Sequence, residues 1–429
     1  MIIELPYGKG YIKYDFPDDK VRGVLSINDQ TIIEQPEQED IVRKALDGPE
    51  GSKRLSELVS GAEKILIITS DHTRPVPSRV TMPIILEQIR SSNPRAEIRI
   101  LIATGFHRAS TAAEIKEKFG DDIAGKEILI NHDSKDEKNM ISLGSLPSGA
   151  ELQLNSLIKW ADITIAEGFI EPHFFAGFSG GRKSILPGIA SQKTVFGNHC
   201  SRFIADGNAR TGNLENNPIH KDMVYAAEKA GLAFILNVVL DKDKRIIAAF
   251  AGDPVKAHEK GCRYLSSIAV KKAVKADIVV TTNGGYPLDQ NIYQAVKSMT
   301  AAEACVREKG TIITVAQCID GHGGEAFYNW LSKNRSPAAA AEKISLIPQQ
   351  ETGPDQWEAQ ILARVLQKAD VIMVADKKSR RYVENMHMRY ACSMEEAFGI
   401  VESLNKKSED IVVIPDGVSV IIDDAEDEV

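Results

Sequence analysis

The chain has 429 residues, of which 43% are hydrophobic and 26% are charged, a composition unlike that of a disordered, collagenous or disulfide-scaffold chain. Its 52 basic and 60 acidic side chains give a net charge of −8, which argues against a nucleic-acid-binding protein. Five cysteines without a C-x-x-C pair favour a reducing compartment, and no apolar run reaches the ~20 residues of a membrane helix. We therefore expect a cytoplasmic enzyme or small-molecule-binding protein with neither nucleic acid nor membrane as partner.

The predicted secondary structure begins with a hairpin and continues as alternating strands and helices. Met1–Phe16 places Gly-Lys-Gly between two β-prone runs, a pattern typical of a hairpin. Strands are predicted, in chain order, at Lys64–Thr69, Ile98–Ala103, Asp162–Ala166, Phe234–Leu240, Asp277–Thr281, Thr311–Val315, Asp370–Val374 and Asp410–Ile414. Amphipathic helices are predicted at Arg79–Arg90, Ala112–Phe119, Pro218–Ala230, Pro254–Ile268, Asn291–Val306, Trp357–Ala369 and Met394–Leu404.

This pattern predicts the fold class and the domain organisation. Several strands are continuously apolar, as in parallel sheets covered on both faces, and strand–helix alternation is typical of α/β folds. We expect two α/β domains, each with a largely parallel sheet flanked by helices, and an active site in the interdomain cleft. Residues 1–270 would form the cofactor-binding and catalytic domain, and residues 275–429 a doubly wound domain closing over it.

Polar, glycine-rich segments follow four of the predicted strands. They are Ser70–Pro77, Thr104–Arg108, Glu167–Ser184 and Thr282–Pro287. Ligands of open parallel sheets bind at the carboxyl ends of the strands. Four such segments together are hard to explain by core packing, so the sequence predicts a binding or catalytic site at these strand ends.

The segment Ser179-Gly-Gly-Arg-Lys-Ser184 has two interpretations. Gly180 and Gly181 would let backbone N–H groups approach an anion closely, and Arg182 and Lys183 would add positive charge, as in a phosphate site. The spacing is not that of a P-loop, because Arg182 stands where a glycine is required before the lysine. A tight turn with solvated basic side chains explains the residues equally well.

A second segment, Asp71–Pro77, predicts a stiff support for Arg74. Pro75 and Pro77 restrict the backbone, and a fixed guanidinium suits a carboxylate or phosphate ligand. Taken alone, a plain proline turn with Arg74 in water is the simpler explanation.

Three loop histidines and one helix complete the set of candidate residues. His107, His173 and His199 lie in loops rich in Gly, Pro and Phe, where imidazoles could be acid/base groups or zinc ligands. Tyr293, Gln294 and Lys297 share one edge of a predicted helix because they are spaced three or four residues apart. With Arg74 they would form an anion-binding pocket, and a solvated helix face is the alternative.

These segments together resemble the nickel-pincer lactate racemase family. The resemblance is carried by Asp71-His-Thr-Arg-Pro-Val-Pro77, Gly105-Phe-His107, the segment Glu171–Ser184, Asn198-His199 and Asp289–Lys297. It extends over most of the chain and implies a two-domain α/β fold. It also implies a cofactor, nickel held by a pyridinium-3,5-bisthiocarboxylic acid mononucleotide that separate synthesis enzymes supply.

The resemblance implies a role for each matching residue. Lys183 would carry the cofactor covalently and His199 would bind nickel, while His107 and His173 would act as acid and base. The remaining roles are contacts to cofactor and to substrate. Cofactor contacts are expected at Asp71, Thr73, Ser179, Gly180, Gly181 and Arg182, and substrate contacts at Arg74, Tyr293, Gln294 and Lys297.

The expected activity is interconversion of L- and D-lactate, by hydride transfer from the substrate Cα to the cofactor and back through bound pyruvate. Three alternatives stay open. The same chemistry could act on another 2-hydroxy acid, such as malate or a sugar acid. The histidines could instead form the site of a zinc hydrolase, or the protein could bind nickel or a phosphorylated nucleotide without catalysis.

Overall fold

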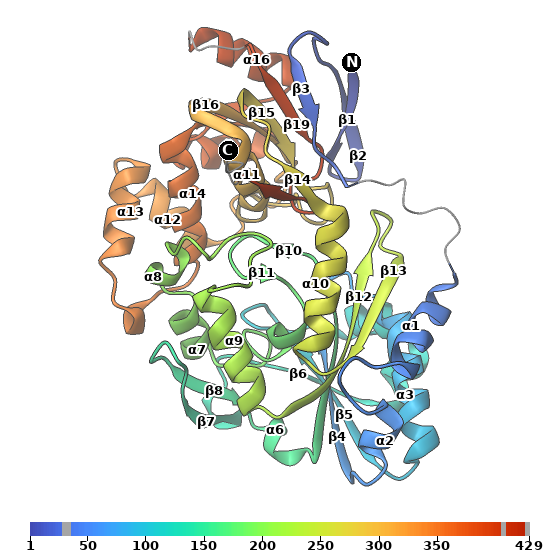
Figure 1. The fold of residues 1–429 in the computed structure, drawn as a ribbon. Coiled ribbons are helices and arrows are strands. Elements are labelled where there is room, and N and C mark those ends of the chain that lie inside the picture. The colour runs from blue at the N-terminus through green and yellow to red at the C-terminus, as the bar shows by residue number, and fades with distance from the viewer. Residues whose placement is uncertain (28–35, 405–408, 425–429) are drawn as a thin grey trace. The chain divides into compact units, whose positions relative to one another are not determined.

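The computed structural model describes residues 1–27, 36–404 and 409–424 (Figure 1). Backbone contacts divide the chain into two units. The N-terminal unit contains the described residues of Gln30–Asn198 and Gly207–Ser267. The C-terminal unit contains those of Met1–Asp29, His199–Asp206 and Ile268–Val429.

A six-stranded sheet forms the centre of the N-terminal unit, with the strand order β13-β12-β9-β4-β5-β6. The strands are β4 (Lys64–Ser70), β5 (Glu97–Ala103), β6 (Ile128–Asn131), β9 (Ile163–Phe169), β12 (Leu232–Leu240) and β13 (Ile246–Gly252). All neighbours are parallel except β12 and β13. The chain proceeds from β4 to one edge and then returns to β9 on the other side. The order of the strands therefore reverses between β4 and β9, the position at which such sheets bind ligands.

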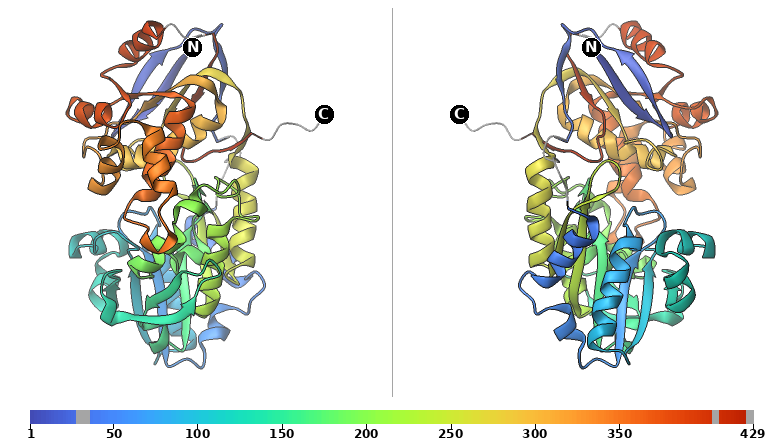
Figure 2. Two further views of the ribbon diagram at one scale, coloured as in Figure 1. Left: turned by 90° about the vertical axis from the view of Figure 1, so that its left-hand side faces the viewer. Right: turned by 90° about the vertical axis from the view of Figure 1, so that its right-hand side faces the viewer.

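Helices, two short strand pairs and two 3₁₀ turns complete this unit. The helices are α1 (Gln38–Asp47), α2 (Leu55–Val59), α3 (Ser78–Ser92), α4 (Ala112–Phe119), α5 (Asp121–Lys126), α6 (Leu157–Trp160), α7 (Gln192–Asn198), α9 (Pro218–Lys229) and α10 (Lys256–Ala269). The short elements are β7 (Met140–Ser145) with β8 (Glu151–Asn155), β10 (Pro172–His173) with β11 (Gly177–Phe178), and the 3₁₀ turns η2 (Glu137–Asn139) and η3 (Gly181–Ser184). Helices α1, α2 and α3 cover one face of the sheet (Figure 2), where their apolar side chains form a core with Ile65, Ile67 and Ile100.

The C-terminal unit has a second six-stranded sheet, with the order β18-β17-β16-β15-β19-β3, and all its neighbours are parallel. Its strands are β3 (Val21–Val24), β15 (Ala276–Thr282), β16 (Val306–Val315), β17 (Asp370–Val374), β18 (Arg389–Ala391) and β19 (Ile411–Ile414). Two further pairs are β1 (Ile2–Tyr7) with β2 (Gly10–Asp15), and β14 (Val270–Lys272) with β20 (Ile421–Asp423). The helices are α8 (Ser201–Ile204), α11 (Ile292–Cys305), α12 (Glu325–Ser332), α13 (Pro337–Ser345), α14 (Gln356–Lys368), α15 (Arg380–Asn385) and α16 (Met394–Ser403), with 3₁₀ turns η4 (Gln349–Glu351) and η5 (Lys377–Ser379).

The predicted α/β class with largely parallel, helix-flanked sheets is confirmed, but the grouping of the first residues differs from the expectation. The boundary near residue 270 lies close to the start of the C-terminal unit at Ile268. The N-terminal hairpin, expected with residues 1–270, instead packs Ile3, Leu5 and Phe16 into the core of the C-terminal unit. A hairpin sequence shows which of its faces is apolar and does not show which sheet that face will cover. Within the described residues, every helix is too short or too polar to cross a membrane.

Candidate active site

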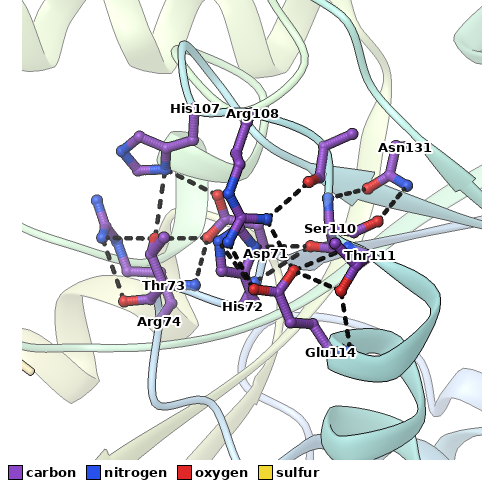
Figure 3. Close-up of polar contacts among 11 residues, drawn as sticks. Asp71, His72, Thr73, Arg74, His107, Arg108, Ser110, Thr111, Glu114 and Asn131 are labelled. Atoms are coloured by element: carbon purple, nitrogen blue, oxygen red, sulfur yellow. Dashed lines mark hydrogen bonds and ion pairs between the residues drawn. The ribbon is translucent and has the colours of Figure 1, made fainter.

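An aspartate–histidine pair lies at the carboxyl ends of the adjacent strands β4 and β5 (Figure 3). Asp71 directly follows β4, and its Oδ2 lies 2.7 Å from Nδ1 of His107 in the loop after β5. Oδ1 of Asp71 accepts from the backbone N–H of Thr73 at 3.0 Å and from its hydroxyl at 2.6 Å. Burial by itself would raise the pKa of Asp71, but the hydrogen bond and charge of His107, with Arg74, hold it below its usual range. Asp71 is therefore a carboxylate, and it fixes the His107 ring with Nδ1 as the donor and Nε2 as the reactive nitrogen.

The segment that carries Arg74 is held from both sides. Nη1 of Arg74 donates to the Thr73 hydroxyl at 3.0 Å. From α4, the ammonium of Lys118 donates to the carbonyls of Arg74 and Val76 at 3.3 and 3.4 Å, and burial lowers the pKa of Lys118. The prediction of a rigid support for Arg74 agrees with these contacts, whereas no sequence signal pointed to the contribution of Lys118.

A further layer fixes the loop of His107. Arg108 pairs with Glu114 through two contacts at 2.6 and 2.8 Å (Figure 3), and Glu114 forms a capping box with Thr111 at the start of α4. Behind Asp71, Nδ1 of His72 lies 2.9 Å from the Ser110 hydroxyl. The part of the loop that follows His107 is thus anchored to α4 and to His72. The spacing Thr-x-x-Glu before a helix is the one sequence signal that could have identified part of this layer.

A buried glutamate connects the strands directly beneath this site. Glu167 of β9 is 1% exposed and accepts hydrogen bonds from the hydroxyls of Thr69, Ser78 and Thr81 at 2.6, 2.6 and 2.5 Å. These bonds join β9 to β4 and α3 at the position where the strand order reverses. In the sequence, this role was indicated by Glu167 being the one charged residue within β9.

The loop after β9 brings His173 and Lys183 to the same phenylalanine. The His173 ring contacts Phe175 with a centroid distance of 4.5 Å, and the ammonium of Lys183 lies 5.9 Å from the centre of the same ring. Nδ1 of His173 accepts from the backbone N–H of Ala176 at 3.3 Å. In the neutral ring the proton is therefore on Nε2, the opposite arrangement to that of His107.

Ser179, Gly181 and Arg182 have structural contacts that differ from the phosphate-site interpretation. The guanidinium of Arg182 is buried and donates to the carbonyls of Ala176 and Gly180 at 2.7 and 3.2 Å and to Nδ1 of His220 at 2.9 Å. Burial lowers the pKa of Arg182 to about 10. The Ser179 hydroxyl donates to the carbonyl of Phe169 at 3.0 Å, inside the same network.

The two glycines of this segment are required by close packing. The N–H of Gly181 donates to Oδ1 of Asn237 at 2.7 Å, so it is not directed at a ligand. Gly180 and Gly181 have φ of 78° and 53°, and a Cβ on Gly181 would lie 2.8 Å from the His258 ring. Residues 179–182 thus form a tightly packed, hydrogen-bonded loop next to Lys183. This loop is neither a phosphate-binding loop nor a solvated turn.

The other candidate residues lie in the C-terminal unit, and two of them, His199 and Tyr293, contact Trp357. The ring of His199, a buried side chain, lies 5.1 Å from the Trp357 ring, and Nε1 of Trp357 donates to the Tyr293 hydroxyl at 3.0 Å. Tyr293 belongs to the first turn of α11, which also carries Gln294 and Lys297. The predicted helix does carry all three residues within its first two turns, and the anion-binding pocket expected from them stays a prediction. Trp357 was missed because it looked like an ordinary apolar residue at a helix start.

A metal site made of protein side chains alone is not found among the described residues. Across residues 1–27, 36–404 and 409–424, no three histidine, cysteine or acidic side chains cluster as metal ligands. A zinc site built from His107, His173 and His199 therefore has no support in the described chain, and Nδ1 of His107 is already bound to Asp71. Imidazole suits nickel, and a nickel ion held by one histidine such as His199 would need a chelating cofactor for its other ligands.

Comparison with known proteins relates the whole chain to one family. The lactate racemase N-terminal domain matches residues 7–212, and the lactate racemase C-terminal domain matches residues 271–422. Lactate racemase from Thermoanaerobacterium thermosaccharolyticum is 55% identical over 420 residues, 98% of this chain and 99% of that protein. Lactate racemase from Lactiplantibacillus plantarum is 50% identical over the same shares of the two chains.

Solved structures give the same relation. The lactate racemase apoprotein from T. thermosaccharolyticum superposes with a TM-score of 0.95 at 55% identity, covering 99% of this chain and 100% of that one. A Thermotoga maritima protein of known crystal structure superposes with a TM-score of 0.64 at 20% identity, covering 90% of this chain and 98% of that one, a likeness of fold alone.

Proposed function

Because the chain belongs to the lactate racemase family, we propose that it is an isomerase that interconverts L- and D-lactate with a nickel-pincer pyridinium nucleotide as its cofactor. The observation that carries the proposal is the imidazole of His107, held by the buried carboxylate of Asp71 at 2.7 Å. An identity of 55% over almost the full length of a lactate racemase supports lactate as the substrate. The reducing cytoplasm remains the compartment that we expect from the cysteines.

His107 and His173 are assigned the proton transfers at the substrate hydroxyl. Asp71 holds the proton of His107 on Nδ1, so Nε2 can accept the hydroxyl proton as the substrate becomes a keto acid. To act as the acid, His173 must carry a second proton as the imidazolium, because a neutral ring that lost its Nε2 proton would become an anion. The backbone N–H of Ala176, which Nδ1 accepts in the neutral ring, then has to move away from Nδ1. The two enantiomers present their hydroxyls on opposite sides of Cα. In one direction of racemisation, His107 is therefore the base and His173 the acid. In the opposite direction the two histidines exchange these roles.

The substrate carboxylate is assigned to Arg74 and Lys297. Arg74 is held by Thr73 and by the segment that Lys118 anchors, which suits a fixed two-point grip on a carboxylate. Lys297 would add a second positive charge. Holding the carboxylate while the keto group reorients lets the same bound acid react on either face.

Lys183 is assigned the covalent attachment of the cofactor and His199 the protein ligand of nickel. The Cα hydrogen of a 2-hydroxy acid is weakly acidic, and the bound pyridinium supplies a hydride acceptor in place of a base strong enough to remove it as a proton. The hydrogen bonds of Arg182 fix the loop that carries Lys183. Phe175 lies beside the ammonium group of Lys183. The enzymes that synthesise the nucleotide are the protein partners that this assignment requires.

The test is chiral analysis of lactate after pure L-lactate is supplied to cofactor-loaded protein. D-lactate should form with the unmodified protein and with Lys193→Ala, which removes an exposed lysine of the same unit, and should not form with Lys183→Ala. D-lactate formed by Lys183→Ala at the unmodified rate would contradict the proposal. Absence of D-lactate from protein whose covalent adduct is verified by mass would instead point to a larger or more acidic 2-hydroxy acid.

A further inference from the structure

The first turn of α14 places an acidic side chain inside the C-terminal unit. Glu358 is 1% exposed, and neither of its carboxyl oxygens has a hydrogen-bond partner among the described residues. A buried ionised carboxyl without partners is costly, and in proteins such groups keep a proton or sit beside a compensating charge. The position of Glu358 therefore calls for a role beyond packing.

Glu358 lies on a pair of packed helices, α14 and α11, that carries residues of the proposed site. Trp357, the preceding residue, contacts both His199 and Tyr293. Helix α11, which packs against α14, carries Gln294, whose Oε1 is likewise buried without a partner. Lys297, one turn further along α11, is the positive charge that acts on Glu358.

Two opposing effects decide the protonation of Glu358. Burial raises the pKa of this carboxyl to about 8, and Asp355 adds to the rise, while the charge of Lys297 opposes it. Farther along, Glu303 of α11 pairs with Arg364 of α14 at 2.7 Å, so these two charges satisfy each other. The charged side chains on α8, α12 and α13 are exposed: Arg202, Glu325, Glu342 and Lys343. Glu358 thus keeps its proton at neutral pH and does not neutralise Lys297.

We propose that Glu358 is a positioning residue that controls how strongly Lys297 attracts the substrate carboxylate, an inference that rests on the proposed function. With a proton on Glu358, the charge of Lys297 acts on the substrate. Without it, the Glu358 carboxylate competes with the substrate for the same ammonium. Substrate binding and proton binding at Glu358 are therefore linked, and each favours the other.

The test is the pH dependence of the KM for lactate in the loaded enzyme, compared with Glu358→Gln, which keeps the shape and cannot ionise. If only the protonated form binds substrate well, KM rises about tenfold between pH 7 and pH 9, whereas kcat changes little. In Glu358→Gln the KM stays low over this range. Glu303→Gln is the matched control, because it removes a partly buried glutamate from the same helix pair and should keep the rise.

A second measurement uses the cofactor-free protein, so it does not depend on activity or loading. Infrared difference spectra should show a carboxylic acid band that disappears as the pH rises through about 8, present in the unmodified protein and in Glu303→Gln and absent in Glu358→Gln. An equal rise of KM in Glu358→Gln, or no such band, would overturn the inference and leave the racemase proposal intact. A loaded protein that racemises no lactate would overturn the proposed function, whatever the band shows.

Discussion

Replacing Asp71 by asparagine tests the assignment of His107 through a change of one atom. Oδ1 of Asp71 accepts from the backbone N–H of Thr73, a donor that cannot reverse its role. In Asp71→Asn the amide oxygen must therefore take that position, and the amide N–H₂ faces Nδ1 of His107. This forces the proton of the imidazole onto Nε2, the nitrogen that has to accept the substrate proton.

The size of the effect follows from the bond that is lost. A hydrogen bond to a charged group is worth about 1.5–3 kcal/mol, which corresponds to roughly 10- to 150-fold in rate at about 1.4 kcal/mol for each factor of ten. The reversed tautomer adds to this, and Asp→Asn in a Ser-His-Asp triad costs about 10⁴. We therefore expect kcat to fall by about 10²- to 10⁴-fold.

The assay is the initial rate of racemisation in both directions, with equal cofactor loading verified by mass. Thr73→Val is the control, because it leaves the Asp71 carboxylate and the backbone N–H in place and removes only the Thr73 hydroxyl. That hydroxyl also accepts from Arg74, so an effect on the substrate carboxylate should appear in KM. Thr73→Val should lower kcat by less than about tenfold. Asp71→Asn with more than a tenth of the unmodified kcat would refute the role given to His107.

Three further predictions concern stability. Burial raises the pKa of Glu358 to about 8 in the folded protein, from 4.5 for an ordinary glutamate. Its favourable contribution to the free energy of unfolding is therefore complete below about pH 4.5 and is lost as the pH rises through 8. The free energy of unfolding, measured with urea, should fall by up to about 4 kcal/mol more in the unmodified protein than in Glu358→Gln between pH 5 and pH 9. The same pH dependence in both proteins would contradict the burial argument. Glu167→Gln replaces an acceptor of three hydroxyl bonds and should lower the free energy of unfolding by about 1–3 kcal/mol, with no loss counting against its structural role. Gly181→Ala places a methyl group 2.8 Å from His258 at a φ of 53° and should cost more than about 1 kcal/mol, whereas Gly125→Ala, with open space at its Cβ, should cost little.

The sequence located most of the strands because strands depend on local pattern. The continuous apolar run at Lys64–Ser70 marks a strand covered on both faces, and the polar residues that follow it lie at a strand end. The motifs at these ends also identified the family, which the comparisons confirm. Local sequence patterns were therefore sufficient to predict the fold class and the family.

The direction of a side chain depends on tertiary contacts, and there the sequence was less informative. Arg182 beside two glycines looked like an anion ligand, but Ala176, Gly180 and His220 surround its guanidinium. Glu358 looked like a polar residue on an amphipathic helix, yet it is buried beside α11. His220 is far from Arg182 in the sequence, and α11 is far from Glu358. Residue spacing therefore could not have indicated these contacts.

The most direct test of the account is racemisation of L-lactate carrying deuterium at C2, in ordinary water. If the hydrogen leaves Cα as a hydride and returns without exchange, the D-lactate formed should keep its deuterium. His107 and His173 would then exchange only the hydroxyl proton with solvent. D-lactate that has lost its deuterium to solvent would show that Cα loses a proton, and would contradict the mechanism proposed for these residues.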